Sequence, residues 1–470
     1  MNIAILHYHL MRGGVTTVIR QQVDALNAQG WNVMVLSGAP CESAFPAHIA
    51  TLPELGYDSR HTCAYSSENI SNKIIAAIRD HWPQGADVIH IHNPTLAKNR
   101  YLQEVLAHLQ KSGMRLLCQI HDFAEDGRPG AYYRSAYLRD CHYAVINQRD
   151  HRLLLDAGLD PRGCHLLPNA VSSINDNGDS TAPADVVLYP IRAIRRKNIG
   201  EALLLSHFLE KDISLAITLP PNSPGDKGSY AHWQSFARRR NLPVRFGVGL
   251  GADYIKLLST CRYVLTTSIT EGFGFAYLEP WLAGKALWGR LLKDTCSGFI
   301  ARGVELEHLY TLLQVDLEWL DADALEMRWK AAFHGAAQRF QVPVSRQEVE
   351  TAWQQICSDG CIDFGLLSEE FQQQVLDRAM DDRGVAAALK ALNPFLHRPA
   401  PPETIGAAIQ RNAAIISAAY NPDQYRRRLS AVYRAVVDTS LSHAIDKRIV
   451  SRYFLSPRSF SLLKWEPFGG

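Results

Sequence analysis

Residues 266–284 read TTSITEGFGFAYLEPWLAG. The pattern predicts a buried strand, then a turn that contains Gly272 and Gly274, and then a helix. Glycine lets the backbone approach a ligand closely, and the free N–H groups at a helix N-terminus attract phosphate or hydroxyl oxygens. Glu271 lies directly before the turn, and Glu279 follows eight residues later within the predicted helix. The stretch therefore predicts a ligand-binding turn between two carboxylates that can accept hydrogen bonds from sugar hydroxyls.

Short apolar runs typical of buried strands alternate with helical patterns on both sides of this turn. In the first part of the chain we expect strands at residues 3–7, 32–36, 88–92, 115–120, 143–146 and 165–167. After a polar stretch, SSINDNGDSTAPA at residues 172–184, the alternation restarts, with strands expected at 186–190, 214–217, 243–246 and 263–266. Strands that alternate with helices predict parallel sheets covered on both faces, so the expected fold class is α/β.

The expected domain organisation follows from these changes of pattern. We expect an N-terminal Rossmann-like domain at residues 1–183, a second Rossmann-like domain at 184–345 and a helical extension at 346–470. The polar stretch at 172–184 is interpreted as the linker. Long helical stretches in the extension include residues 369–380 and 402–419.

The composition is typical of a globular enzyme, with 47% apolar and 20% charged residues. The 49 Lys and Arg residues balance 47 Asp and Glu residues, so the charge does not favour nucleic acid as a partner. The sequence shows neither a signal peptide nor an apolar run of about 18 residues, so we expect a cytoplasmic protein without a transmembrane segment. Peripheral membrane contact and the oligomeric state stay open. Nine cysteines at irregular spacing predict reduced thiols.

The spacing of Glu271 and Glu279 around the inner GFGFAYL resembles family 4 of the retaining glycosyltransferases, which have the GT-B fold. The resemblance covers roughly residues 1–290. It implies two facing Rossmann-like domains, with a nucleotide-sugar donor held mainly by the second and an acceptor held mainly by the first. An ordinary strand–turn–helix connection, with Glu271 as a helix cap, is the structural alternative. Beyond Gly284 the sequence departs from the family pattern.

Basic residues and glycines in the second domain extend the resemblance. In LYPIRAIRRKNIGEALL, at residues 188–204, Arg192 and Lys197 resemble the family's pair that grips the donor diphosphate, although Ile191 replaces the usual glycine. Arg195 and Arg196 are expected to face solvent, and a solvated basic loop is the alternative for the whole segment. The resemblance implies catalytic roles for Arg192, Lys197 and Glu271, and donor contacts from Gly249, Gly272, Phe273, Gly274, Phe275 and Glu279.

In the first domain the resemblance rests on a glycine and a histidine. Gly14, within HYHLMRGGVTT, would offer its amide N–H to the donor phosphate or sugar. His121, within CQIHDF, would face the reacting sugar as a catalytic residue. The structural alternatives are a helix-entry turn for Gly14 and an ordinary loop histidine for His121.

Four more histidines lie near the carboxyl ends of two predicted strands, which is where ligands bind in open α/β sheets. They are His7, His9, His90 and His92. We expect an acceptor pocket to which His9 and His92 contribute, and a zinc site is the less favoured alternative. Asp321 and Asp323 lie at a predicted helix start and are interpreted as a cap, so metal ligands are not expected.

The predicted activity is the retaining transfer of a hexose from a nucleotide-sugar donor to a small soluble hydroxyl acceptor, with no required cofactor. A UDP- or GDP-linked donor is favoured over an ADP-linked one. The resemblance implies reaction on one face of the sugar, with the departing phosphate taking the proton of the acceptor. Two alternatives stay open: a sugar-nucleotide epimerase of the same scaffold, and a non-catalytic nucleotide-sugar-binding protein.

Overall fold

The computed structural model describes residues 1–11, 13–41, 44–60, 64–172 and 185–469. Cys63 and residues 173–184 of the expected linker lie outside the described residues. The chain divides into two compact units, each with its own parallel sheet. Unit 1 consists of Met1–Ser172 and Ala418–Tyr453, and unit 2 consists of Ser173–Ser417 and Phe454–Gly470.

The described strands of unit 1 form one parallel sheet in the order β3-β2-β1-β4-β5-β6-β7. Their bounds are β1 Asn2–His7, β2 Asn32–Ser37, β3 His48–Thr51, β4 Val88–His92, β5 Leu116–Ile120, β6 His142–Val145 and β7 Cys164–Leu166. The helices that follow them are α1 Gly14–Asn27, α2 Ser67–His81, α3 Leu102–Lys111 and α4 Gln148–Asp156. The central strands are buried throughout because helices cover both faces of the sheet.

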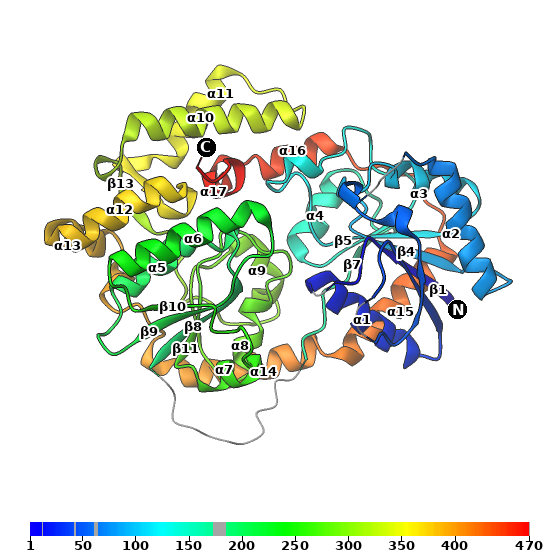
Figure 1. Cartoon of the computed structure of the whole chain (residues 1–470), viewed down its shortest axis with the longest axis horizontal. Coiled ribbons are helices and arrows are strands. Elements are labelled where there is room, and N and C mark those ends of the chain that lie inside the picture. The colour runs from blue at the N-terminus through cyan, green and yellow to red at the C-terminus, as the bar shows by residue number, and fades with distance from the viewer. Residues whose placement is uncertain (12, 42–43, 61–63, 173–184, 470) are drawn as a thin grey trace. The chain divides into compact units, whose positions relative to one another are not determined.

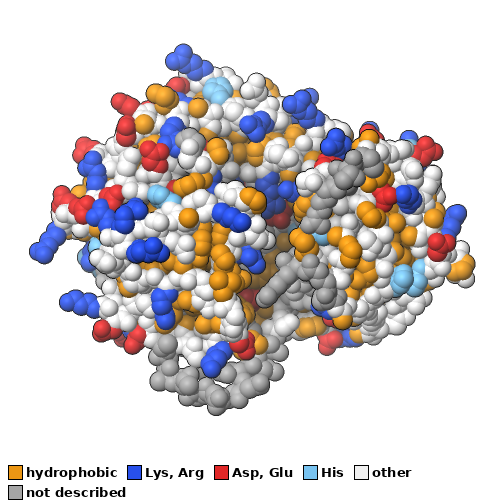
Figure 2. Space-filling model, viewed as in Figure 1, with side chains coloured by type: hydrophobic (Ala, Val, Ile, Leu, Met, Phe, Trp, Pro, Cys, Tyr) orange, Lys and Arg blue, Asp and Glu red, His pale blue; other side chains and the backbone are white. Residues whose placement is uncertain are grey.

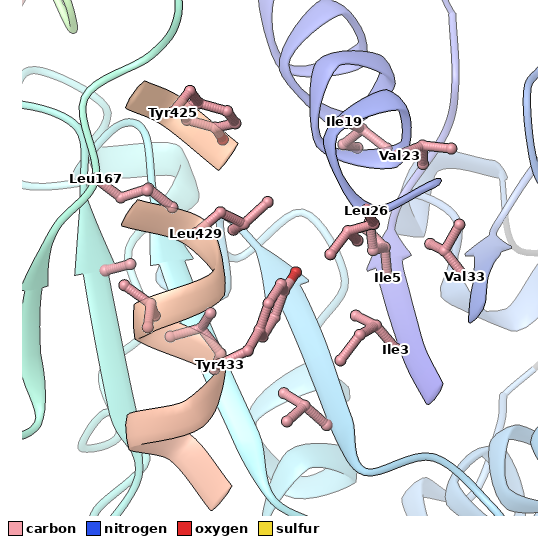
Figure 3. Close-up of a cluster of buried hydrophobic side chains, with 14 of the residues drawn as sticks. Ile3, Ile5, Ile19, Val23, Leu26, Val33, Leu167, Tyr425, Leu429 and Tyr433 are labelled. Carbon is pink, nitrogen blue, oxygen red and sulfur yellow. The ribbon is translucent and has the colours of Figure 1, made fainter. Parts of the chain in front are cut away.

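A helix from the far end of the chain completes unit 1. α15 (Pro422–Asp438) lies beside α1, and α16 (Lys447–Phe454) follows it (Figure 1). Leu429 and Tyr433 of α15 pack in one core cluster with Ile5 of β1 and Leu26 of α1 (Figure 3). The core of this unit is therefore built from chain segments about 400 residues apart, such as Gln22 and Tyr425, whose side chains share a hydrogen bond across 403 positions.

Unit 2 contains a second parallel sheet, in the order β10-β9-β8-β11-β12. Its strands are β8 Val186–Arg192, β9 Ser214–Leu219, β10 Val244–Phe246, β11 Tyr263–Thr266 and β12 Leu287–Gly289. The accompanying helices are α5 Ile199–His207, α6 Pro224–Arg239, α7 Tyr254–Thr260, α8 Glu279–Leu282 and α9 Lys293–Ile300. Two short strands, β13 (Gln314–Asp316) and β14 (Cys361–Asp363), pair antiparallel outside this sheet.

The C-terminal region is largely helical, as the sequence predicts. It contains α10 Ala322–Arg339, α11 Arg346–Ile356, α12 Glu369–Asp381, α13 Arg383–Leu392, α14 Gly406–Ala419 and α17 Leu462–Trp465. Reciprocal hydrogen bonds between Ser345 and Glu348 form a capping box that starts α11. The region differs from the single extension expected at 346–470, because its residues are divided: 418–453 pack with unit 1, whereas the rest pack with unit 2.

Four short strands were not expected from the sequence. They are β3, β12, β13 and β14, and β14 lies in a region where only helices were expected. Other strands of three or four residues, such as β7 and β11, were predicted, so length alone does not explain the omission. Each overlooked strand owes its conformation to pairing with a neighbouring strand, which a single sequence does not reveal.

Basic and acidic side chains are interspersed over the visible face of the molecule, in keeping with a formal net charge of +2 (Figure 2). Within the described residues, helices long and apolar enough to cross a membrane are absent. Among the described residues, Cys118, Cys141, Cys164, Cys261, Cys296, Cys357 and Cys361 are thiols outside any disulfide.

Truncation of Leu429 tests the contribution of α15 to unit 1. Leu429 is 1% exposed, so Leu429→Ala removes buried apolar contacts and leaves a cavity. We expect a loss of about 2–5 kcal/mol in the free energy of unfolding of unit 1. Calorimetry of the full chain measures this as a downward shift of one transition. Arg434→Ala, at an exposed position of the same helix, is the matched control, and equal shifts for both variants would contradict the packing of α15.

Candidate active site

The carboxyl ends of β8 and β11 carry the residues that the sequence singled out in the second domain. Lys197 follows β8 in the short 3-10 helix η4 (Arg195–Lys197), and Glu271 follows β11. The two strands are neighbours and parallel, so their loops emerge at the same edge of the sheet. Lys197 Nζ donates a hydrogen bond to a Glu271 carboxylate oxygen, and the two side chains are only 13% and 10% exposed. The structure thus joins two of the predicted catalytic residues in one ion pair.

The electrostatics keep Glu271 ionised. Burial by itself would raise the pKa of Glu271, but the charges of Lys197 and Arg196 lower it, and the net pKa lies below its ordinary value. A buried carboxylate held ionised in this way is a strong hydrogen-bond acceptor, as a sugar hydroxyl requires.

Arg196 contributes to this electrostatic environment, so the prediction that it faces solvent is wrong. Its Nη1 lies 3.4 Å from the carbonyl oxygen of Thr270, and its own carbonyl accepts a hydrogen bond from the Ile269 N–H at 3.0 Å. Within the described residues, its Nε is buried and has no hydrogen-bond partner. Arg196 therefore places a second cation beside Glu271, and its Nε–H remains available as a hydrogen-bond donor.

Arg195 was also expected to face solvent, and the structure contradicts this too. Its guanidinium makes two 2.6 Å hydrogen bonds with the carboxylate of Glu369 in α12, and a third with the backbone carbonyl of Glu466. The Arg195 and Glu369 side chains are 10% and 4% exposed. Consecutive residues of a 3-10 turn point in different directions, so one arginine is a structural anchor while its neighbours reach the site.

Further buried hydrogen bonds fix the backbone that presents Lys197. Asn198 follows it with φ 53°, a left-handed conformation. Asn198 Oδ1 accepts a hydrogen bond from Gln372 of α12 at 2.8 Å, and its Nδ2 donates to Glu201 at 2.7 Å. The Lys197 carbonyl accepts a hydrogen bond from the Thr267 hydroxyl at 3.1 Å. The loop is thus held from three sides before any ligand binds.

Arg192 lies apart from the Lys197–Glu271 pair. It is the last residue of β8, and its Nη1 donates to the carbonyl oxygen of Pro220 at 3.1 Å. The structure leaves it half-buried at the carboxyl edge of the sheet, so its predicted contact with a diphosphate stays a prediction.

The glycine-containing turn has the backbone that its sequence implies. Gly274 has φ +93°, and a Cβ at this position would lie 3.2 Å from the Tyr277 ring, so other residues would be strained there. Instead of one helix, a 3-10 turn η5 (Phe275–Tyr277) is followed by the four-residue α8. Phe273 is 4% exposed and packs edge-on to Phe299, so it could reach a donor only through its backbone.

Glu279 opens α8 rather than lying inside a helix as predicted. Its carboxylate accepts a hydrogen bond from the hydroxyl of Tyr254 at 2.9 Å, and burial raises its pKa. Tyr254 begins α7 and is 39% exposed, and sequence reasoning missed it. The preceding loop is held by the Gly249 N–H, which donates to the carbonyl oxygen of Thr218 at 2.9 Å. A tyrosine just after that glycine-rich loop was the signal available in the sequence.

In unit 1 the structure brings the predicted histidines together at the carboxyl ends of β1, β4 and β5. His92 Nδ1 lies 2.8 Å from His121 Nε2, and the two rings are stacked. His92 Nε2 lies 3.0 Å from Oε1 of Gln22, whose amide also donates to Tyr425 of α15 at 2.9 Å. Sequence reasoning missed Gln22, although a polar residue on the apolar face of α1 was a signal for a buried network.

His92 is more buried than its predicted acceptor role suggests. Its side chain is fully buried and both of its ring nitrogens have partners, so a positioning role toward His121 fits its contacts, and the acceptor role stays a prediction. His9 is half-buried, with Nε2 3.1 Å from the Tyr57 hydroxyl, and stays a candidate acceptor residue. Gly14 is the first residue of α1, and a Cβ there would meet open space.

Burial keeps the histidine network neutral. It lowers the pKa of His7 and of His90 to about 3 and that of His121 to about 4. Each ring at neutral pH therefore has one donor and one acceptor nitrogen. In the described part of the chain, groups of three or more His, Cys, Asp or Glu side chains arranged to hold a metal ion are absent. Asp321 caps α10, accepting a hydrogen bond from the Ala324 N–H at 3.1 Å, as predicted.

The anchoring role of Arg195 can be tested by stability. Arg195→Ala would leave the Glu369 carboxylate buried without its cation, which should cost about 3–5 kcal/mol. Urea unfolding of the full chain measures the loss, with Arg238→Ala at an exposed position of α6 as the control. A loss no larger than that of the control would show that Arg195 is solvated, as the sequence had suggested.

Comparison with known proteins agrees with this geometry. Residues 12–173 match the model of Glycosyltransferase Family 4, a range that coincides with the N-terminal part of unit 1. The chain is 24% identical over 438 residues to mannosylglucosyl-3-phosphoglycerate synthase of Petrotoga mobilis, covering 83% of each protein.

Two solved structures share the fold. Sucrose-phosphate synthase of Thermosynechococcus elongatus superposes with a TM-score of 0.53 at 15% identity, over 92% of this chain and 98% of that one. HepE of Anabaena, in complex with UDP-glucose, superposes with a TM-score of 0.51 at 14% identity, over 92% and 98%. Residues 12–173 thus resemble Glycosyltransferase Family 4, and the chain as a whole is an enzyme, a glycosyltransferase with the GT-B fold.

Proposed function

We propose that the enzyme transfers a hexosyl group, with retention of anomeric configuration, from a UDP- or GDP-linked donor to a hydroxyl of a small soluble acceptor in the cytoplasm. The observation that carries the proposal is the buried ion pair of Lys197 and Glu271, with Arg196 beside it. Cations suit a diphosphate and an ionised carboxylate suits sugar hydroxyls, so this one edge of the unit 2 sheet has complementary groups for both parts of a nucleotide sugar.

In the proposed reaction the acceptor oxygen forms a bond to the anomeric carbon while the bond from that carbon to the diphosphate oxygen breaks. The electron pair of the broken bond stays on the departing nucleoside diphosphate. The proton of the acceptor hydroxyl goes to the departing phosphate oxygen on the same face of the sugar. Lys197 and Arg196 would stabilise the charge that develops on the diphosphate, with Arg192 as a further candidate.

The donor and acceptor classes are supported by the relatives. Neighbours of the same fold are solved with UDP and UDP-glucose, which supports a nucleotide-sugar donor. The curated relative is named for a phosphoglycerate product, which supports a small soluble acceptor over a lipid. We propose Glu279 as the ribose-binding residue, with Tyr254 beside it, since a carboxylate can accept hydrogen bonds from the two ribose hydroxyls. The proposed reaction requires no metal or cofactor.

The comparisons do not favour the two alternatives. An epimerase or a non-catalytic binding protein would share the scaffold, but the matched family and the curated relative are both glycosyltransferases.

Substitutions of Glu279 and Glu271 should have different effects, one on nucleotide binding and the other on turnover. Glu279→Ala should weaken UDP binding, because it removes a charged hydrogen-bond partner of the ribose, by about 10- to 100-fold. Glu271→Gln should mainly lower turnover. Calorimetric titration with UDP and the rate of donor hydrolysis measure the two effects. If Glu279→Ala binds UDP as tightly as the parent protein, the ribose assignment is wrong.

The cations should act mainly in the transition state. Lys197→Ala should lower turnover about 30- to 1000-fold, the equivalent of about 2–4 kcal/mol, with a smaller effect on donor affinity. Arg196→Ala should lower turnover as well, because Arg196 lies beside Glu271. Single-turnover rates measure both, with Arg245→Ala on β10 as the exposed control. Rates for Lys197→Ala and Arg196→Ala that match the control would exclude this edge as the diphosphate site.

A further inference from the structure

Lys98 lies in the loop between β4 and α3, at the carboxyl end of the unit 1 sheet. The backbone of this loop is pinned on both sides. The Ala97 N–H donates to the Ala131 carbonyl at 2.7 Å, and the Lys98 carbonyl accepts from the Asp58 N–H at 2.8 Å. Lys98 is therefore a half-buried side chain on a fixed backbone, in contrast to a lysine on a mobile surface loop.

Among the described residues, Lys98 has no carboxylate as a direct ion-pair partner. Its Nζ lies 5.7 Å from the centre of the Tyr57 ring. Asp122, the acid whose charge acts on Lys98, accepts a 2.8 Å hydrogen bond from Arg128. Within the described ranges, Lys98 makes no ion pair and no side-chain hydrogen bond. Two cations thus share Asp122, and Lys98 is the one left without direct contact.

The surroundings of Lys98 disfavour the charged form of its side chain. Burial lowers the pKa of Lys98, the charge of Arg128 lowers it further, and Asp122 only partly opposes these effects. Keeping the Lys98 ammonium charged in this half-buried position costs free energy, and a bound anion would offset that cost. Tyr57 also contacts His9, the candidate acceptor residue, so Lys98 lies beside the predicted acceptor region and within the same unit.

We propose that Lys98, with Arg128 and Tyr57, forms a subsite for a compact anionic group, a phosphate or a carboxylate, on the acceptor substrate. The inference rests on the proposed transferase function and adds the chemical class of the acceptor. Lys98 would supply a point charge, Arg128 a second cation whose position Asp122 fixes, and the Tyr57 hydroxyl a hydrogen bond. A neutral acceptor would leave the ammonium of Lys98 uncompensated.

Binding of simple anions to the full chain tests this subsite. The protein is first saturated with UDP, which occupies the donor phosphate region, and is then titrated calorimetrically with inorganic phosphate, acetate or, as a neutral probe, glycerol. We expect phosphate or acetate to bind, and Lys98→Met to weaken that binding about tenfold or more, because a charge-assisted hydrogen bond is lost. Lys98→Arg should retain binding, and Lys111→Met, at an exposed position of α3, should leave it unchanged.

The two anions separate a phosphate subsite from a carboxylate subsite. Equal anion binding by the parent protein and Lys98→Met, or a parent protein that binds neither anion, would overturn the proposal. A failure of the transferase function would be seen separately, as the lack of UDP binding and of donor hydrolysis. The difference in anion binding between the parent protein and Lys98→Met can be interpreted whether or not the protein binds UDP.

Discussion

The arrangement at the edge of the unit 2 sheet depends on one buried ion pair, Arg195 with Glu369. A single arginine connects the loop after β8 to helix α12, with both side chains almost fully buried. Gln372, one turn further along the same helix, holds Asn198. Between these two anchors lie Arg196 and Lys197, whose directions are therefore fixed by contacts that a ligand need not provide. Preorganised cations avoid reorganisation when charge develops on a leaving group.

The C-terminal helices are consequently part of both units. α12 holds the loop that carries Lys197, and α15 supplies Tyr425 and Tyr433 to the histidine network and core of unit 1. Tyr433 donates to or accepts from His90 at 2.8 Å. Polar contacts of this kind specify one arrangement of a core because an unpaired buried group is costly. Because α15 belongs to the core of unit 1 and α12 anchors the loop after β8, the C-terminal region does not behave as an appended domain.

The sequence predicted the main sheets well, because a buried parallel strand is a continuous apolar run. The strands at Val88–His92 and Tyr263–Thr266 were predicted with their observed bounds. Arg195 and Arg196 were predicted wrongly for a physical reason: the partner of Arg195 is 174 residues away, and only the folded chain brings it near. The pairing of Lys197 with Glu271 is equally non-local, across 74 positions, but there the family resemblance indicated both residues.

His92 illustrates the same limit in unit 1. Its place at the end of a strand suggested a ligand contact, whereas the folded unit buries it between His121 and Gln22.

The central claim is that the Lys197–Glu271 edge holds a nucleotide sugar for transfer with retention. The most direct test is proton NMR of the purified protein with UDP-glucose and, in parallel, GDP-mannose, recording the anomeric configuration of the first sugar product. The account predicts release of the nucleoside diphosphate and an α-configured product from an α-linked donor. A β-configured first product would contradict retention, and unchanged donors at stoichiometric enzyme would contradict the transferase itself.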